Sequence, residues 1–92
     1  STIFIPNSFT PDGDGINDYW RIYASNVGNI DIMITNRTGE IVFRTDDPDK
    51  AWLGDKNEAR YYVEDGIYFY TIIYKDENDD TQKLTGTVLL LR

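Results

Sequence analysis

Cysteine and histidine are both absent from this chain of 92 residues. Without cysteine the chain cannot form a disulfide, a thiolate zinc site or a cysteine nucleophile. Without histidine it cannot build a Ser–His–Asp triad, so Ser8 and Ser25 have no base to activate them. Carboxylate pairs such as Asp14 and Asp18 lie in polar loop sequence, whereas acid–base catalysis needs them in an enclosed site. The composition therefore predicts a protein that is not an enzyme.

A long apolar run is missing too. No stretch of about 18 apolar residues occurs, so neither a transmembrane helix nor insertion into a membrane is predicted. The formal net charge is −7, and Asp far outnumbers Glu, which places most of this charge in turns. An acidic surface repels phosphate backbones and anionic lipids. No nucleic-acid partner is therefore expected.

Short stretches of alternating apolar and polar residues make up most of the chain. Residues 30–36 place Ile30, Ile32 and Ile34 on one face, which is the period of a half-buried strand. Residues 67–74 are apolar on both faces and predict a central strand that is covered on each side. Further strands are expected at 3–5, 19–23, 41–44 and 83–92, with an extended or irregular segment at 58–63. The predicted fold is all-β: an antiparallel β-sandwich, immunoglobulin-like, of about seven strands, forming one domain over residues 1–92.

Three local features carry their own predictions. Residues 36–39 indicate a hairpin turn in which Gly39 takes a positive φ. Trp52 is the largest apolar residue of a long polar connection from 45 to 57, and we expect it to fold back as a lid on one end of the core. Gly86 interrupts the last strand and indicates a β-bulge there.

The opening segment, residues 5–20, is predicted to be one long polar loop, because two prolines exclude helix and two Asp–Gly pairs favour turns. Asp12, Asp14 and Asp18 fall at positions 1, 3 and 7 of a calcium-binding loop, with the Ile16 carbonyl at position 5. The match to the EF-hand pattern is incomplete, because its position 12 holds a tyrosine instead of a bidentate Glu. Two interpretations stay open: a calcium site, or a structural turn whose side chains cap backbone groups.

The opening segment also begins a pattern that extends over essentially the whole chain. Its blocks, in order, are IPNSFTPDGDGIND at 5–18, ITNRTGEIVF at 34–43, WLG at 52–54, GIYFY at 66–70 and LTGTVLLLR at 84–92. This pattern resembles the gliding motility-associated C-terminal domain, also called the type B sorting domain of the type IX secretion system of Bacteroidetes. The chain departs from that family at Thr38, where a Trp is usual, and at Leu53, where an Asp is usual.

The resemblance implies a non-catalytic sorting signal at the C-terminus of a larger secreted protein, from which this chain would be a piece. It implies transit through the periplasm and then export to the cell surface or the medium. It also implies two partners, the type IX outer-membrane translocon and a small outer-membrane barrel. Docking contacts are expected at Asn36, Arg37, Gly39, Glu40 and Arg92, with exposed aromatics among Tyr61, Tyr62 and Tyr74 as further candidates.

A second function stays open on the residues alone. The chain carries seven Tyr and two Trp, and aromatic rings of this kind stack on sugars when they are exposed. The alternative to a sorting signal is therefore a carbohydrate-binding or adhesive β-sandwich module, with Trp20 and Trp52 as stacking platforms and calcium organising the opening loop.

Overall fold

Strands and no helix make up the described part of the protein, which in this computed structural model covers residues 2–11, 18–56 and 61–92. The strands are β1 (Thr2–Phe4), β2 (Ser8–Phe9), β3 (Tyr23–Ser25), β4 (Gly28–Thr35), β5 (Ile41–Thr45), β6 (Asp55–Lys56), β7 (Tyr61–Tyr62), β8 (Gly66–Lys75) and β9 (Thr81–Leu90). The prediction of an all-β fold is confirmed. The number of strands exceeds the expected seven. Three of the strands, β2, β6 and β7, are only two residues long.

Five of the strands form one sheet in the order β2-β9-β8-β4-β5. Its two longest members, β8 and β9, pair antiparallel from Gly66↔Leu90 to Lys75↔Thr81, and β4 and β5 extend the sheet antiparallel on the other side. The exception is β2, whose residues pair with the end of β9 in parallel. The opening segment therefore contains a strand, so its prediction as one continuous loop is wrong. The other pairs of the sheet are antiparallel, as the sequence predicted.

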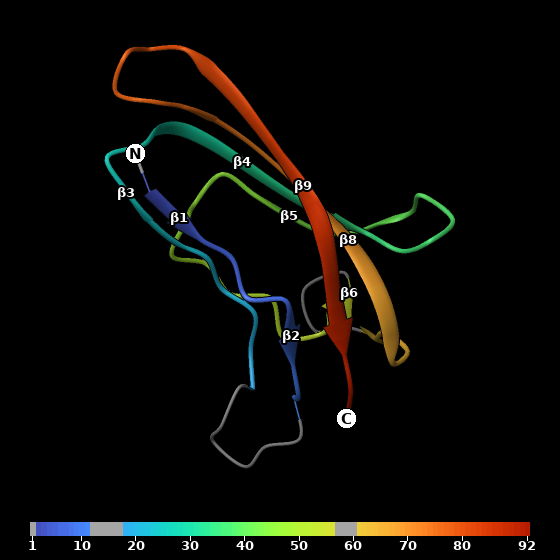
Figure 1. Ribbon diagram of the computed structural model, residues 1–92. Coiled ribbons are helices and arrows are strands. Elements are labelled where there is room, and N and C mark those ends of the chain that lie inside the picture. The colour runs from blue at the N-terminus through green and yellow to red at the C-terminus, as the bar shows by residue number, and fades with distance from the viewer. Residues whose placement is uncertain (1, 12–17, 57–60) are drawn as a thin grey trace.

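The opposite layer of the sandwich is smaller. In Figure 1, the antiparallel pair β1 and β3 lies beside the large sheet, and β6 with β7 forms a second small pair. Ile3, Ile5 and Ala24 of this layer pack against the core of the sheet. The strand predicted at 3–5 is found at 2–4, and that at 19–23 is replaced by an isolated bridge at Trp20 followed by β3.

Trp52 lies at the centre of the core, fully buried. Its backbone pairs with that of Trp20 in an isolated antiparallel bridge, and its indole Nε1 donates a hydrogen bond to the Asp55 carbonyl at 2.8 Å. Its ring packs on three others, with centroid distances of 5.3 Å to Phe9, 5.3 Å to Tyr68 and 6.4 Å to Phe43. The prediction of a lid was wrong, because the indole is fully enclosed by the core and its backbone is held by the bridge to Trp20.

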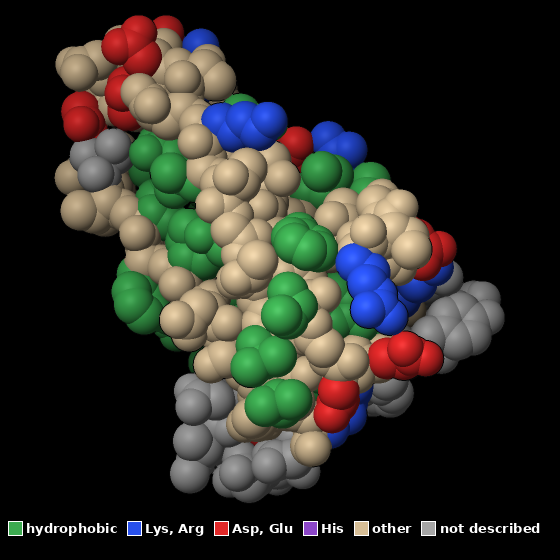
Figure 2. All heavy atoms as spheres, turned by 45° about the vertical axis from the view of Figure 1, so that its right-hand side comes forward, with side chains coloured by type: hydrophobic (Ala, Val, Ile, Leu, Met, Phe, Trp, Pro, Cys, Tyr) green, Lys and Arg blue, Asp and Glu red, His purple; other side chains and the backbone are tan. Residues whose placement is uncertain are grey.

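The predicted alternation holds in β4, where Ile30, Ile32 and Ile34 are all buried. It also holds in β8, but only one face of that strand is covered. Tyr68 and Ile72 point into the core, whereas the alternate residues Ile67, Phe69 and Ile73 are 56%, 41% and 39% exposed. Figure 2 shows hydrophobic side chains on one face of the molecule, separated by uncharged groups and bordered by charged side chains. The prediction that β8 is covered on both faces was wrong, because the second layer lies on one side of the sheet alone.

Gly86 is not a bulge, since the register between β8 and β9 runs unbroken past it. It pairs with Tyr70 of the neighbouring strand. A Cβ at residue 86 would lie 2.6 Å from Tyr70 Cζ and 2.7 Å from its Cε2. Glycine is therefore needed because the tyrosine ring crosses directly over the β9 backbone at this position.

Candidate docking surface

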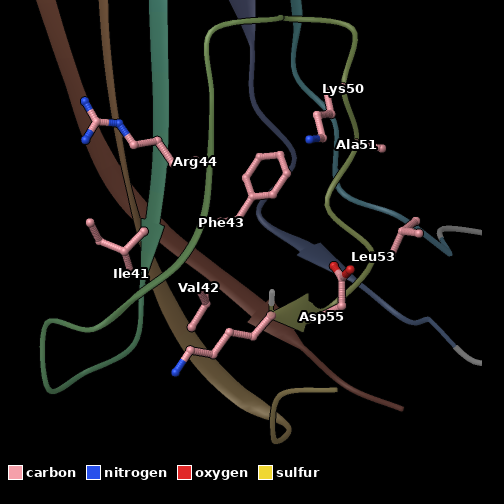
Figure 3. A pocket seen from close by; sticks show the side chains of 9 residues that line it. Ile41, Val42, Phe43, Arg44, Lys50, Ala51, Leu53 and Asp55 are labelled. Atoms are coloured by element: carbon pink, nitrogen blue, oxygen red, sulfur yellow. The ribbon is translucent and has the colours of Figure 1, made fainter. Parts of the chain in front are cut away.

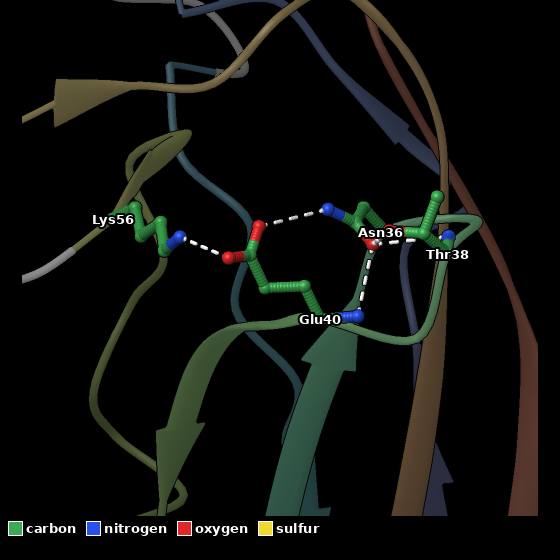
Figure 4. Close-up of polar contacts among 4 residues, drawn as sticks. All are labelled: Asn36, Thr38, Glu40 and Lys56. Carbon is green, nitrogen blue, oxygen red and sulfur yellow. Dashed lines mark hydrogen bonds and ion pairs between the residues drawn. The ribbon is translucent and has the colours of Figure 1, made fainter.

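The turn between β4 and β5 is fixed by the side chain of Asn36. Its Oδ1 accepts hydrogen bonds from the backbone N–H of Thr38 at 3.1 Å, the Thr38 hydroxyl at 2.7 Å and the backbone N–H of Glu40 at 2.9 Å. Its Nδ2 donates to Glu40 Oε1 at 3.1 Å. Figure 4 shows these contacts converging on one amide. An asparagine that binds its own turn in this way holds the loop rigid without help from the core.

Gly39 closes this turn with φ of +88°, and its N–H donates to the Asn36 carbonyl at 3.0 Å. Nothing lies within 4 Å of where a Cβ would stand. The glycine is therefore required by the backbone conformation alone, as the sequence predicted. Arg37, Thr38, Gly39 and Glu40 are all exposed, so the rigid turn presents its side chains to solvent.

Lys56 of β6 forms an ion pair with Glu40 of this turn. Its Nζ lies 2.5 Å from Glu40 Oε2, while the other oxygen of that carboxylate binds Asn36. The hydrogen bond and charge of Lys56 lower the pKa of Glu40 below its ordinary value. A lowered carboxyl pKa favours the fold above the unfolded-state pKa, and that contribution is lost as pH falls through the folded-state pKa. The pair therefore ties the turn to β6 at neutral pH.

Two grooves flank this ion pair. One, of about 500 Å³, lies between β5 and the segment 50–56; Figure 3 shows the Phe43 ring in it, with Arg44, Lys50 and Leu53 at its margin. The other, of about 590 Å³, runs from the Asn36–Glu40 turn to the start of β8. Val42 and Lys56 line both grooves. The turn and the two grooves, which we call the β5 surface, form one continuous face with an apolar floor and a charged rim.

Arg92 ties the end of β9 to the segment that precedes β8. Its guanidinium donates to the carbonyls of Gly54 at 2.8 Å and Val63 at 2.5 Å and pairs with the Asp65 carboxylate at 3.3 Å. Its backbone N–H donates to the same carboxylate at 3.0 Å. The side chain predicted as a docking contact is 29% exposed and holds three parts of the chain together.

The comparison with protein families decides the identity of the chain. A family model described as the CHU_C type IX secretion signal domain matches residues 3–90. The chain belongs to the CHU_C family. The resemblance noted in the sequence is therefore confirmed, and no curated protein matches the chain.

As a CHU_C domain, the chain is a type IX secretion signal: it is a sorting signal that interacts with the type IX machinery and directs export towards the cell surface or the extracellular space. The family is one of secretion signals. Among the described residues no helix is long and apolar enough to cross a membrane.

The structure of the CHU_C domain brings four of the predicted docking residues together in one turn, Asn36, Arg37, Gly39 and Glu40. Arg92 lies elsewhere, bound to Gly54 and Asp65. Tyr74 packs against the core, and the side chains of residues 61 and 62 are outside the described part. Sequence reasoning missed Lys56 and Val42, because a lone cation in a polar connection and a core residue of a short strand carry no pattern that points to a shared groove.

Of the predicted calcium ligands, Asp12, Asp14 and Ile16 lie outside the described residues, and Asp18 is half-buried. Among the side chains that the structure places, no group of three or more acidic residues is arranged to hold a metal ion. The calcium site stays a prediction that rests on the spacing of the opening loop.

This prediction can be tested by melting the domain in calcium and in chelator. A ligand that binds only the folded state stabilises it by about 2.7 kcal/mol when its concentration is about a hundred times its Kd. We therefore expect a higher Tm in millimolar calcium, and we expect Asp14→Ala to melt at the chelator value under both conditions. Equal Tm values for the unaltered domain in calcium and in chelator would leave the structural turn as the correct interpretation.

Proposed function

We propose that this CHU_C domain is a non-catalytic address that the type IX outer-membrane translocon and a small outer-membrane barrel partner recognise in its folded form. Recognition takes place as the passenger crosses the periplasm, and export then carries it to the cell surface or the medium. The proposal is supported most directly by the β5 surface, in which a turn fixed by Asn36 stands between two grooves. A rigid turn loses little entropy on docking, and adjoining grooves offer room for a partner's anchor residues.

The carbohydrate-binding alternative loses its main support from the burial of its proposed platforms. Trp20 is 1% exposed and Trp52 is fully buried. A ring that stacks on a sugar must present a face to solvent, and both faces of each indole are packed in the core. Both indole N–H groups are also used internally, by the carbonyls of Pro6 and Asp55.

The proposed docking can be tested with a reporter that carries residues 1–92 in a cell with the type IX system. We expect the reporter to leave the cell, and Arg37→Ala to lower its export about tenfold, the effect of roughly 1.4 kcal/mol lost from binding. Arg37 is exposed on the turn, so its removal should leave the Tm unchanged. The measurement is the fraction of reporter outside the cell.

The matched control is Asn78→Ala, at an exposed position of the turn between β8 and β9. This variant should be exported like the original. A reporter that stays inside with the unaltered domain would contradict the proposed function itself. Export of Arg37→Ala at the control level would instead show that the partner docks away from the β5 surface.

A further inference from the structure

Most of one side of β9 has no strand partner. On its first side β9 pairs with β8 over its full length. On its second side it pairs with β2 only, at Leu89 and Leu90. The strand β2 consists of Ser8 and Phe9 alone, so it covers only this end of β9. No other described strand contacts β9. Residues 81–87, which we call the β9 edge, are therefore an open sheet margin within the described part of the protein.

The backbone groups of the β9 edge point outward in a known order. The N–H of Leu89 donates to the Asn7 carbonyl at 2.9 Å, and that of Leu91 to the Phe9 carbonyl at 3.2 Å. Backbone groups alternate in direction along a strand, so the N–H groups of Lys83, Thr85 and Thr87 point to this same side. The even-numbered residues direct theirs at β8. The outward-facing backbone N–H and C=O groups of the β9 edge thus point to the side on which β2 pairs with β9, and no described strand binds them.

Natural sheets usually protect such a margin with proline, a bulge, inward charges or several lysines. The β9 edge has no proline, its register with β8 is unbroken, and Lys83 is its single charged residue. Its sequence, TQKLTGT, is rich in the β-branched threonine that strands favour. A long edge with so little protection is suited to accept a further strand.

Tyr70 adds a side-chain contact to this edge. Its ring crosses from β8 over Gly86, and its hydroxyl lies closest of its atoms to the site of a Cβ at that glycine. No hydrogen bond to this hydroxyl forms with any residue that the structure describes. A strand laid along the β9 edge would meet this hydroxyl next to the bare backbone of Gly86, where a polar side chain could bind it.

We propose that the β9 edge accepts an extended segment of a type IX component as an added strand. This inference rests on the proposed function and adds a second contact, at the opposite end of the strand order from β5. The edge starts directly after the exposed acidic residues Asp79 and Asp80, so the segment carries a basic residue at that end. A second copy of this chain fits poorly, because each copy has a net charge of −7.

The test places proline at an outward-facing amide. Thr85→Pro removes an N–H that β8 does not use, so it blocks an added strand and leaves the β8–β9 ladder in place. Thr85→Val is the matched control, because it keeps the N–H and the side-chain shape. With the reporter described above, we expect Thr85→Pro to cut export at least tenfold, with a cooperative melt retained, and Thr85→Val to leave export unchanged.

Tyr70→Phe covers the case in which the proline variant fails to fold, since it keeps the ring over Gly86 and removes only the hydroxyl. We expect it to lower export several-fold, and Asp79→Asn combined with Asp80→Asn to do the same. Normal export of folded Thr85→Pro, or of Tyr70→Phe where the proline variant is unfolded, would overturn the inference while the proposed function stands. A dimer of the unaltered domain that Thr85→Pro dissociates would also overturn it, because the added strand would then come from a second copy.

Discussion

Trp52→Ala is expected to lower the free energy of unfolding by about 3–5 kcal/mol, the range for deleting a buried Trp or Phe. The side chain is fully buried, and its removal takes one ring away from three aromatic neighbours and leaves the Asp55 carbonyl without its donor. A domain of this size has a total stability on the order of 5–10 kcal/mol, so the variant should lose most of it. Urea or thermal unfolding followed by Trp fluorescence and circular dichroism measures the change.

The neighbouring Leu53→Ala serves as the control, because Leu53 is 48% exposed in the same segment. It should change stability by no more than about 0.5 kcal/mol. Similar losses for both variants would mean that the segment, and not the indole, supports the core, and would contradict the central place of Trp52.

Gly54→Ala is expected to cost about 2–5 kcal/mol for two separate reasons. The residue has φ of +75°, which costs an L-residue roughly 1–2 kcal/mol. The added Cβ would also lie 3.0 Å from the Arg92 guanidinium and 3.0 Å from Leu90 Cδ1, and forcing such contacts costs about 1–3 kcal/mol. Part of this loss should appear as release of the Arg92 contacts, which NMR of that side chain would detect.

Gly39→Ala separates the two terms. Its φ of +88° is equally unfavourable for alanine, but nothing lies within 4 Å of its Cβ position. It should cost only the backbone term, about 1–2 kcal/mol. If the two alanine variants lose the same stability, the crowding around Gly54 contributes nothing and the Arg92 contacts adapt without loss.

Period-two patterns predicted the faces of the strands well where one layer covers them. Ile30, Ile32 and Ile34 are buried as their spacing requires, because a half-buried strand repeats every second residue. The same reasoning failed for β8, since apolar residues on both faces do not reveal whether a second layer is present. Local pattern therefore determined which residues share a face, and tertiary packing determined which face is covered.

Trp52 and Phe9 show what the sequence could not reveal about topology. Both lie in polar surroundings that resemble loops, yet both are buried, because distant backbone pairing holds them in place. The candidate site, likewise, could be predicted only in part from the sequence. The spacing from Asn36 to Gly39 identified the turn, whereas the grooves beside it depend on how residues 50–56 return past β5.

The parallel pairing of β2 with β9 has a consequence for biosynthesis. Ser8 and Phe9 are among the first residues of the domain to be translated, and their partners Leu89 and Leu90 are among the last residues of the domain. A nascent polypeptide that ends before residue 81 has neither the strand between β2 and β8 nor the buried Val88 and Leu90. Contacts so distant in sequence also slow folding. A ribosome must therefore release nearly all of the domain before it can close its sheet, so a passenger truncated within it lacks the finished shape.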